Sequence, residues 1–162
     1  MRKSIEATVE KMLEGCGSWQ PIFETTWKFV KATDDNSLGV LFKKALGGYT
    51  EARYDLGLYI VEGEGDLPKN ERLGLLWVWL AAEAGDGWAV NNLATMVERG
   101  QGIEANPPEA FRLYKIAAEM GVPQAKQNLA RCYRCGRCGG RDEAEAERLE
   151  AEARECLTGE RS

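Results

Sequence analysis

Apolar residues recur along this chain at the spacing of amphipathic helices. Within residues 4–14 they fall at i, i+4, i+7 and i+8, which predicts a first helix of about three turns. Pro21 suits the first turn of a second helix. A third helix is expected over residues 38–46, where Gly47 and Gly48 close it. The pattern predicts an all-α chain.

The positions that begin and end these helices repeat from residue 48 onward. Three kinds of mark recur with a period of 36 or 37 residues: a glycine ending the second helix of a unit, a glycine ending the first, and a polar N-cap of the second. The marks are Gly48, Gly85 and Gly121; Gly63, Gly100 and Gly136; Asn70, Asn106 and Asp142. Their agreement predicts a repeat of two helices per unit.

Small residues follow a leucine inside each first helix, at Gly57, Ala94 and Ala130. They favour close approach of two helix backbones. The motifs around them are AxxxLGxxIxxGxG from Ala52, AxxxLAxxVxxGxGI from Ala89 and AxxxLAxxYxxG from residue 125. This pattern resembles the Sel-one-like repeat family, α/α-solenoid relatives of the tetratricopeptide repeats. The resemblance covers about residues 37–155.

The resemblance implies an all-α fold, a short right-handed α/α solenoid of about three to four helix-turn-helix repeats with capping helices at both ends. We expect one domain over residues 1–162, with N-terminal capping helices in 1–36 and core repeats in 37–121. Residues 122–157 would hold the last repeat and the C-terminal capping helix, and 158–162 a tail. An irregular helical bundle at the N-terminal end is the alternative.

Composition narrows the class of partner. The chain has 162 residues, 44% apolar and 29% charged, with a net charge of −5, so a soluble globular domain is expected. Its acidic balance disfavours nucleic acid. The sequence holds no run of 18 apolar residues and no recognisable export signal, and its five cysteines are an odd number. These features predict a cytoplasmic protein with reduced thiols, no membrane contact and a monomeric state.

If the resemblance holds, the first helix of each unit lines a concave groove for a protein or peptide. Side chains that alternate with the packed positions should point outward there. They are Glu51, Tyr54, Leu58 and Val61; Trp88, Asn91, Thr95 and Glu98; Gln124, Gln127, Arg131 and Arg134. Tyr54, Leu58 and Trp88 would be apolar anchors, although packing against the N-terminal helices would explain them equally well.

Two further expectations concern these helices. Charge along the groove drifts from acidic at Glu51 to basic at Arg131 and Arg134, which would orient a partner. On the second helices, four large side chains are expected in the core: Trp77, Trp79, Leu113 and Tyr114.

Three cysteines stand at C-x-x-C-x-x-C spacing, and a fourth follows downstream. They are Cys132, Cys135, Cys138 and Cys156. Such thiols could bind zinc or an iron-sulfur cluster. However, Cys156 ends a helix that would carry it about 20 Å from the others, and the chain has no histidine. We therefore expect no metal and no cofactor, and keep a cysteine metal site as a minor alternative.

Catalysis is not expected either, because the commonest general base is absent and no phosphate-binding or nucleophile motif occurs. Two functions remain. The resemblance implies an adaptor that binds a protein or peptide in its groove. A dedicated inhibitor of one partner, such as a bacterial toxin-immunity protein, fits the small acidic chain as well.

Overall fold

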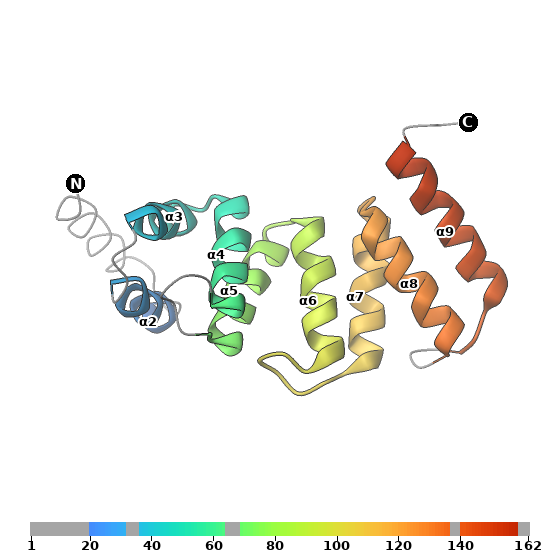
Figure 1. The fold of residues 1–162 in the computed structure, drawn as a ribbon, viewed down its shortest axis with the longest axis horizontal. Helices are drawn as coiled ribbons and strands as arrows, with labels where there is room; N and C mark the ends of the chain where they lie inside the picture. Colours follow the sequence, from blue (N-terminus) through green and yellow to red (C-terminus); the bar gives the residue numbers. More distant parts are fainter. Residues whose placement is uncertain (1–19, 32–35, 64–68, 137–139, 159–162) are drawn as a thin grey trace. The chain divides into compact units, whose positions relative to one another are not determined.

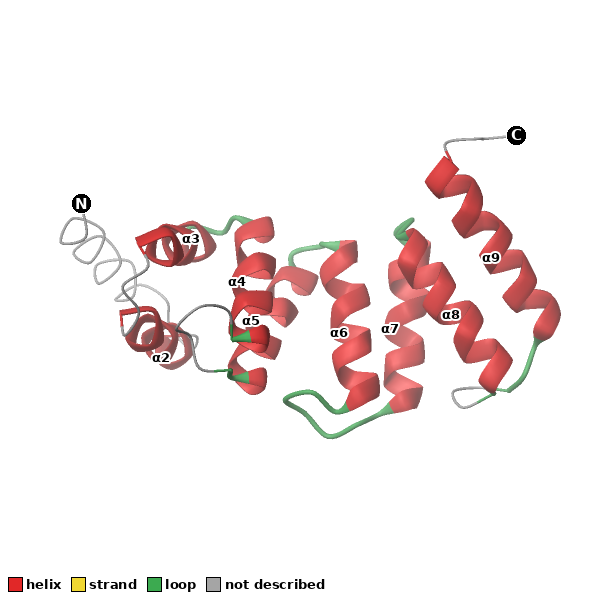
Figure 2. Cartoon of the chain, viewed as in Figure 1, coloured by secondary structure: helices red, strands yellow, loops and turns green. Residues whose placement is uncertain are grey.

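The computed structural model describes residues 20–31, 36–63, 69–136 and 140–158, and within these ranges it contains helices and no strand (Figures 1 and 2). None of these described helices is long and apolar enough to cross a membrane. The helix expected over residues 4–14 lies outside the described part of the chain. The helices are α2 (Gln20–Lys31), α3 (Asn36–Leu46), α4 (Thr50–Glu62), α5 (Glu71–Glu83), α6 (Gly87–Arg99), α7 (Pro107–Glu119), α8 (Pro123–Cys135) and α9 (Glu143–Thr158).

The chain divides into two compact units, residues 1–84 and 85–162. The first holds α2 to α5 and the second α6 to α9. Within each unit, helices that follow one another pack together, α4 on α5, α6 on α7, and α8 on both α7 and α9. The all-α prediction is confirmed, whereas the single domain with its capping segments stays a prediction.

The helix ends confirm the predicted repeat. Gly63, Gly100 and Gly136 all end a helix with left-handed backbone, at φ of 70°, 73° and 64°. A side chain with Cβ rarely adopts this conformation, so glycine is required there. The three residues predicted as N-caps also cap their helices. The side-chain oxygens of Asn70, Asn106 and Asp142 accept hydrogen bonds from backbone N–H groups three residues later.

A backbone hydrogen bond closes the loop of every repeat in the same way. The N–H of each N-cap residue donates to a carbonyl of the preceding helix, at 2.9 to 3.2 Å between nitrogen and oxygen. The pairs are Asn70 to Ile60, Asn106 to Val97, and Asp142 to Tyr133. The three repeats thus share a backbone hydrogen bond between the N-cap of the second helix and the first helix, although the sequences between these residues differ.

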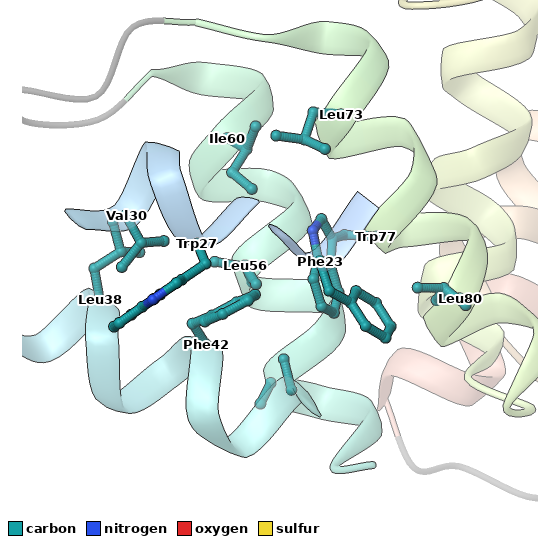
Figure 3. Close-up of a cluster of buried hydrophobic side chains, with 12 residues drawn as sticks. Phe23, Trp27, Val30, Leu38, Phe42, Leu56, Ile60, Leu73, Trp77 and Leu80 are labelled. Carbon is teal, nitrogen blue, oxygen red and sulfur yellow. The ribbon is translucent and has the colours of Figure 1, made fainter. Parts of the chain in front are cut away.

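Aromatic side chains form the core of the first unit (Figure 3). Phe23 of α2 stacks on Trp77 of α5 with ring centroids 5.0 Å apart, and Trp27 stacks on Phe42 of α3 at 5.5 Å. The Trp77 indole Nε1–H donates to the buried Thr26 hydroxyl at 2.8 Å. This hydrogen bond joins residues that lie 51 positions apart and fixes α2 against α5.

Glycines bring α4 and α5 into backbone contact. A Cβ on Gly74 would lie 2.6 Å from the Gly57 carbonyl oxygen and 2.9 Å from the Val61 nitrogen, and a Cβ on Gly57 would crowd Val78 in the same way. In the second unit the equivalent positions, 36 or 37 residues later, are Ala94 and Ala110, both fully buried. The small residues in the first helices therefore serve close packing, as the sequence predicted.

The second helices contribute less to the core than expected. Trp77 and Tyr114 are fully buried, which confirms two of the four predictions. Leu113 is only half-buried, and Trp79 is 37% exposed, so the prediction for Trp79 is wrong. The reason is angular, since Trp79 stands two residues after Trp77 and faces away from it. The C-terminal helix α9 buries only three side chains, namely Ala146, Leu149 and Ala153.

We predict that Gly74→Ala destabilises the first unit. Helix propensity alone would make this change stabilising by about 1 kcal/mol, whereas the contact with the Gly57 carbonyl should cost about 1–3 kcal/mol or more. Urea unfolding followed by circular dichroism gives the sign. Removing Val61 methyls in the double variant Val61→Ala, Gly74→Ala should not rescue it, because the backbone atoms remain. An increase in the free energy of unfolding would contradict the glycine contact.

We also predict that Thr26→Val lowers the free energy of unfolding by about 1–3 kcal/mol, because it leaves the Trp77 indole N–H buried without an acceptor. Thr25→Val is the matched control. Its exposed hydroxyl makes the same kind of bond, to the Pro21 carbonyl, and its loss should change stability by less than about 0.5 kcal/mol. Equal effects of the two substitutions in urea unfolding would argue against a structural Thr26–Trp77 bond.

Candidate functional site: a polar depression of the second unit

Three helices of the second unit line a depression of about 420 Å³, called the α6–α8 depression below. Its walls come from α6 and α8, and Tyr114 enters from α7 between them. The lining residues are Asn91, Asn92, Thr95, Glu98, Arg99, Tyr114, Gln124, Asn128 and Arg131. Every one of these side chains carries a polar group, so the depression offers hydrogen bonds rather than an apolar surface.

Two asparagines join the walls of the depression. The Asn128 Nδ2 group of α8 donates to Asn91 Oδ1 of α6, with 3.0 Å between the atoms. Asn91 is only 2% exposed, and it is one of two buried polar residues among those described. Buried amides are costly unless hydrogen-bonded, so this pair needs a structural or functional reason.

A second polar network lies beside this pair. Arg131 binds the Glu98 carboxylate with two hydrogen bonds, at 2.9 and 2.6 Å, and thereby links α8 to α6. The Tyr114 hydroxyl donates to the same carboxylate at 2.9 Å and lies 3.0 Å from the Thr95 hydroxyl. Every polar group of this network thus has a partner within the second unit.

The network shifts two protonation equilibria. The hydrogen bonds from Arg131 lower the pKa of Glu98 below its ordinary value, and the bond from Tyr114 adds to this, although burial opposes it. Burial raises the pKa of Tyr114 to about 12, with the adjacent Glu98 carboxylate contributing. At neutral pH, Glu98 and Arg131 are therefore an ion pair and Tyr114 is a neutral donor.

The structure brings together part of the groove predicted from the sequence. Asn91, Thr95, Glu98 and Arg131 all line the α6–α8 depression, as does Gln124. The prediction that Asn91 points outward is wrong, because its side chain is buried in the wall. Gln127 and Arg134 lie on α8 but outside the depression. Trp88 lies near the start of α6 and is 51% exposed.

The predicted residues of the first unit lie elsewhere. Leu58 lines an apolar depression of about 420 Å³ between α3 and α4, together with Val40 and Tyr59. Glu51 is exposed and Tyr54 is half-buried. Val61 was expected to face outward, but it is 9% exposed and packs against Gly74 of α5, so that prediction is wrong.

The positive charge expected toward the end of the groove is neutralised by ion pairs among the described residues. Arg131 pairs with Glu98, and Arg134 pairs with Glu143 and Glu150 of α9. Glu98 belongs to the predicted groove residues, whereas Glu143 and Glu150 of α9 do not. The two arginines therefore connect helices and do not form a free basic patch.

Four residues of the depression were not among the predicted site residues: Asn92, Arg99, Tyr114 and Asn128. Helical spacing could have found three of them. Asn92 lies three residues before Thr95 and Arg99 four residues after it, and Asn128 recurs 36 residues after Asn92. Tyr114 was assigned to the core, correctly, but its hydroxyl also reaches the depression.

The cysteines show no shared site among the described residues. Cys132 is buried, whereas Cys135 and Cys156 are exposed, and Cys138 lies outside the described residues. The Cys156 sulfur lies 4.0 Å from the Lys126 ammonium nitrogen. Within the described ranges no three metal-binding side chains come together. The absence of a metal site stays a prediction.

We predict a pH-dependent effect of Glu98→Gln. The folded-state pKa of Glu98 is lowered, so its ionised form stabilises the fold above the ordinary pKa near 4.5, and this contribution disappears as the pH falls through the lowered value. At pH 7 the variant should be less stable by about 1–2 kcal/mol, and the difference should shrink as the pH falls below 4.5. Urea unfolding across that range measures it. A difference that stayed constant would contradict the ion pair.

A model of the Sel1 repeat matches residues 50–86, 89–122 and 123–149. Chitin synthase regulatory factor 3 of Schizosaccharomyces pombe is 42% identical over 82 residues, 50% of this chain and 9% of that protein. DAP3-binding cell death enhancer 1 of Mus musculus is 30% identical over 95 residues, 59% of this chain and 18% of that protein. The chain thus spans less than a fifth of either relative.

Two solved structures have a similar fold. A Sel1 repeat protein of Oxalobacter formigenes is similar with a TM-score of 0.68 and 27% identity, over 84% of this chain and 56% of that one. A protective antigen of uropathogenic Escherichia coli with an SLR fold is similar with a TM-score of 0.69 and 26% identity, over 93% of this chain and 33% of that one. The sequence match, the shared helix caps and the helix pairs agree, and the chain belongs to the Sel1 repeat family.

Proposed function

We propose that this chain is a protein-binding module, an adaptor that holds a protein or peptide partner on the α6–α8 depression. Proteins built from Sel1 repeats typically mediate protein–protein interactions. Two relatives carry names of this kind, one a regulatory factor and one a binding protein. These likenesses support a scaffold role and leave the partner open.

One observation carries the proposal: the second unit keeps polar side chains in a depression where apolar packing would be more stable. Asn91 is buried there at 2% exposure, and the Thr95, Tyr114 and Asn128 side chains join it across three helices. Each of these four side chains has a hydrogen-bond partner in the depression, so the surface is already ordered before a partner arrives. Preorganisation of this kind favours binding because less conformational entropy is lost.

The chemistry supports a binding role over catalysis. The chain has no histidine, and the carboxylate in the depression, Glu98, is neutralised by Arg131. Its pKa is lowered, which weakens it as a general base. The net charge of −5 favours a protein over a nucleic acid. We further propose a monomeric cytoplasmic protein, and Tyr54 and Trp88 stay predicted anchors.

We predict that Asn128→Arg abolishes partner binding, because the long charged side chain fills the depression. Gln127→Arg is the matched control, since Gln127 precedes Asn128 on α8 and lies outside the depression. Tagged wild-type and variant chains would be purified from the native cell, co-purifying proteins quantified by mass spectrometry, and the dissociation constant of the main partner measured by calorimetry.

The expected result is at least a tenfold loss of affinity for Asn128→Arg, about 1.4 kcal/mol, with little change for Gln127→Arg and unchanged circular dichroism for both. Equal binding by the two variants would show that the partner docks elsewhere. The same experiment separates the two roles. Several partners of moderate affinity support the adaptor, whereas one stoichiometric and very tight partner would support the dedicated inhibitor instead.

A further inference from the structure

We infer that residues 4–14, which lie outside the described part of the chain, dock on the apolar depression between α3 and α4 of the first unit and cover it. The depression has a volume of about 420 Å³ and is called the α3–α4 depression below. It belongs to a different unit from the α6–α8 depression, and its occupant is supplied by the chain itself, so the proposed function does not depend on this docking.

The α3–α4 depression leaves apolar side chains in contact with water. Val40 of α3 is 40% exposed and Tyr59 of α4 is 38% exposed. Leu41 and Leu58 line the same depression and are half-buried. A second apolar surface that covered these four side chains would gain free energy by removing them from water. The depression is therefore suited to an apolar occupant.

Residues 4–14 carry a matching apolar stripe. Ile5, Val9 and Met12 recur at i, i+4 and i+7, so a helix over this segment presents them on one face. Leu13 adds a fourth apolar side chain at i+8. A single helix of about three turns is barely stable alone in water, so the segment needs an apolar surface on which to fold. Two neighbouring helices with apolar side chains between them offer such a surface.

The connection between the segment and α2 is long enough for this docking. Residues 15–19 separate the two, and five extended residues span about 17 Å. α2 begins near the C-terminal end of α4. Ile22 of α2 lines a surface depression together with Asn70. The Asn70 N–H donates to the carbonyl of Ile60, the neighbour of Tyr59 on α4.

The short connection also favours the chain's own segment over other occupants. A segment tethered by a few flexible residues has an effective concentration in the millimolar range at a site within its reach. A second copy of the chain, or another protein with an amphipathic helix, would have to displace residues 4–14 from the α3–α4 depression. Its apparent affinity would be lowered by the fraction of chains in which the segment is docked.

Photo-crosslinking in the full chain tests this docking. The photoreactive residue p-benzoylphenylalanine would replace Val9 or Met12 on the apolar stripe, or Ala7 as the matched control, which faces the opposite side of the predicted helix. Unlabelled and isotopically labelled chains would be mixed at low micromolar concentration, irradiated, and their cross-linked peptides identified by mass spectrometry. Circular dichroism shows which variants fold, and Met12 carries the test if the Val9 variant does not.

Hydroxyl-radical labelling of Tyr59 gives a second measurement. Val9→Glu places a charge on the apolar stripe and should release the segment, whereas Ala7→Glu is the matched control with the same new side chain. Tyr49 is exposed and lies outside the α3–α4 depression, so its labelling is the internal reference.

We expect positions 9 and 12 to cross-link within one chain to peptides of α3 and α4, at least fivefold more than position 7. Val9→Glu should raise the labelling of Tyr59 relative to Tyr49 at least twofold, and Ala7→Glu should leave this ratio unchanged.

Three results would overturn the docking. Cross-links between labelled and unlabelled chains in place of those within one chain would show that a second copy occupies the depression. Cross-links from the stripe to other helices, or none above the control, would place the segment elsewhere. An unchanged Tyr59 ratio in Val9→Glu would show that the depression is not covered. None of these results affects the proposed function, which is tested on Asn128 of the second unit.

Discussion

The distance between the two helices of a repeat is the constraint on which the rest of the structure depends. In the first unit, α4 and α5 touch backbone to backbone at Gly57 and Gly74, and in the second the equivalent positions hold Ala94 and Ala110. Larger side chains there would separate the helices. In all three repeats the N-cap residue of the second helix donates a backbone hydrogen bond to the first helix, so a wider pair would also break this bond.

A helix that packs closely against its neighbour on one side can carry polar, solvent-facing residues on its other side. On α6, Ala94 belongs to the packed side, while Asn91, Thr95 and Glu98 line the depression. The polar side chains can therefore be satisfied by α7 and α8 without entering the apolar contacts of the pair. A polar surface built on rigid helices is held more firmly than one built on loops. This separation is what makes the α6–α8 depression a credible binding site.

Much of the fold could be predicted because its signals are local. The glycine caps at Gly63, Gly100 and Gly136 and the N-caps at Asn70 and Asn106 depend on the conformation of a few neighbouring residues, which the sequence specifies directly. Their period then identified the repeat.

The candidate site was predicted less well because it depends on distant contacts. The burial of Asn91 depends on a partner 37 residues away, and the pairing of Arg131 with Glu98 on one 33 residues away. The prediction for Val61 was wrong for the same reason, since its burial depends on Gly74 of the neighbouring helix. The bond from Trp77 to Thr26 of α2 is equally invisible in the repeat pattern, because α2 precedes the matched units.

Different interactions stabilise the interior of each unit, and this difference has a thermodynamic consequence. Stacked aromatic rings dominate the first, whereas α8 and α9 of the second are linked by ion pairs such as Lys126–Glu152 and Arg134–Glu143 over a core rich in alanine. Burial of apolar surface carries a large heat capacity of unfolding, whereas surface ion pairs respond to ionic strength. Cooling should therefore weaken the first unit more, and concentrated salt the second, so that temperature and ionic strength decide which half of the chain opens first.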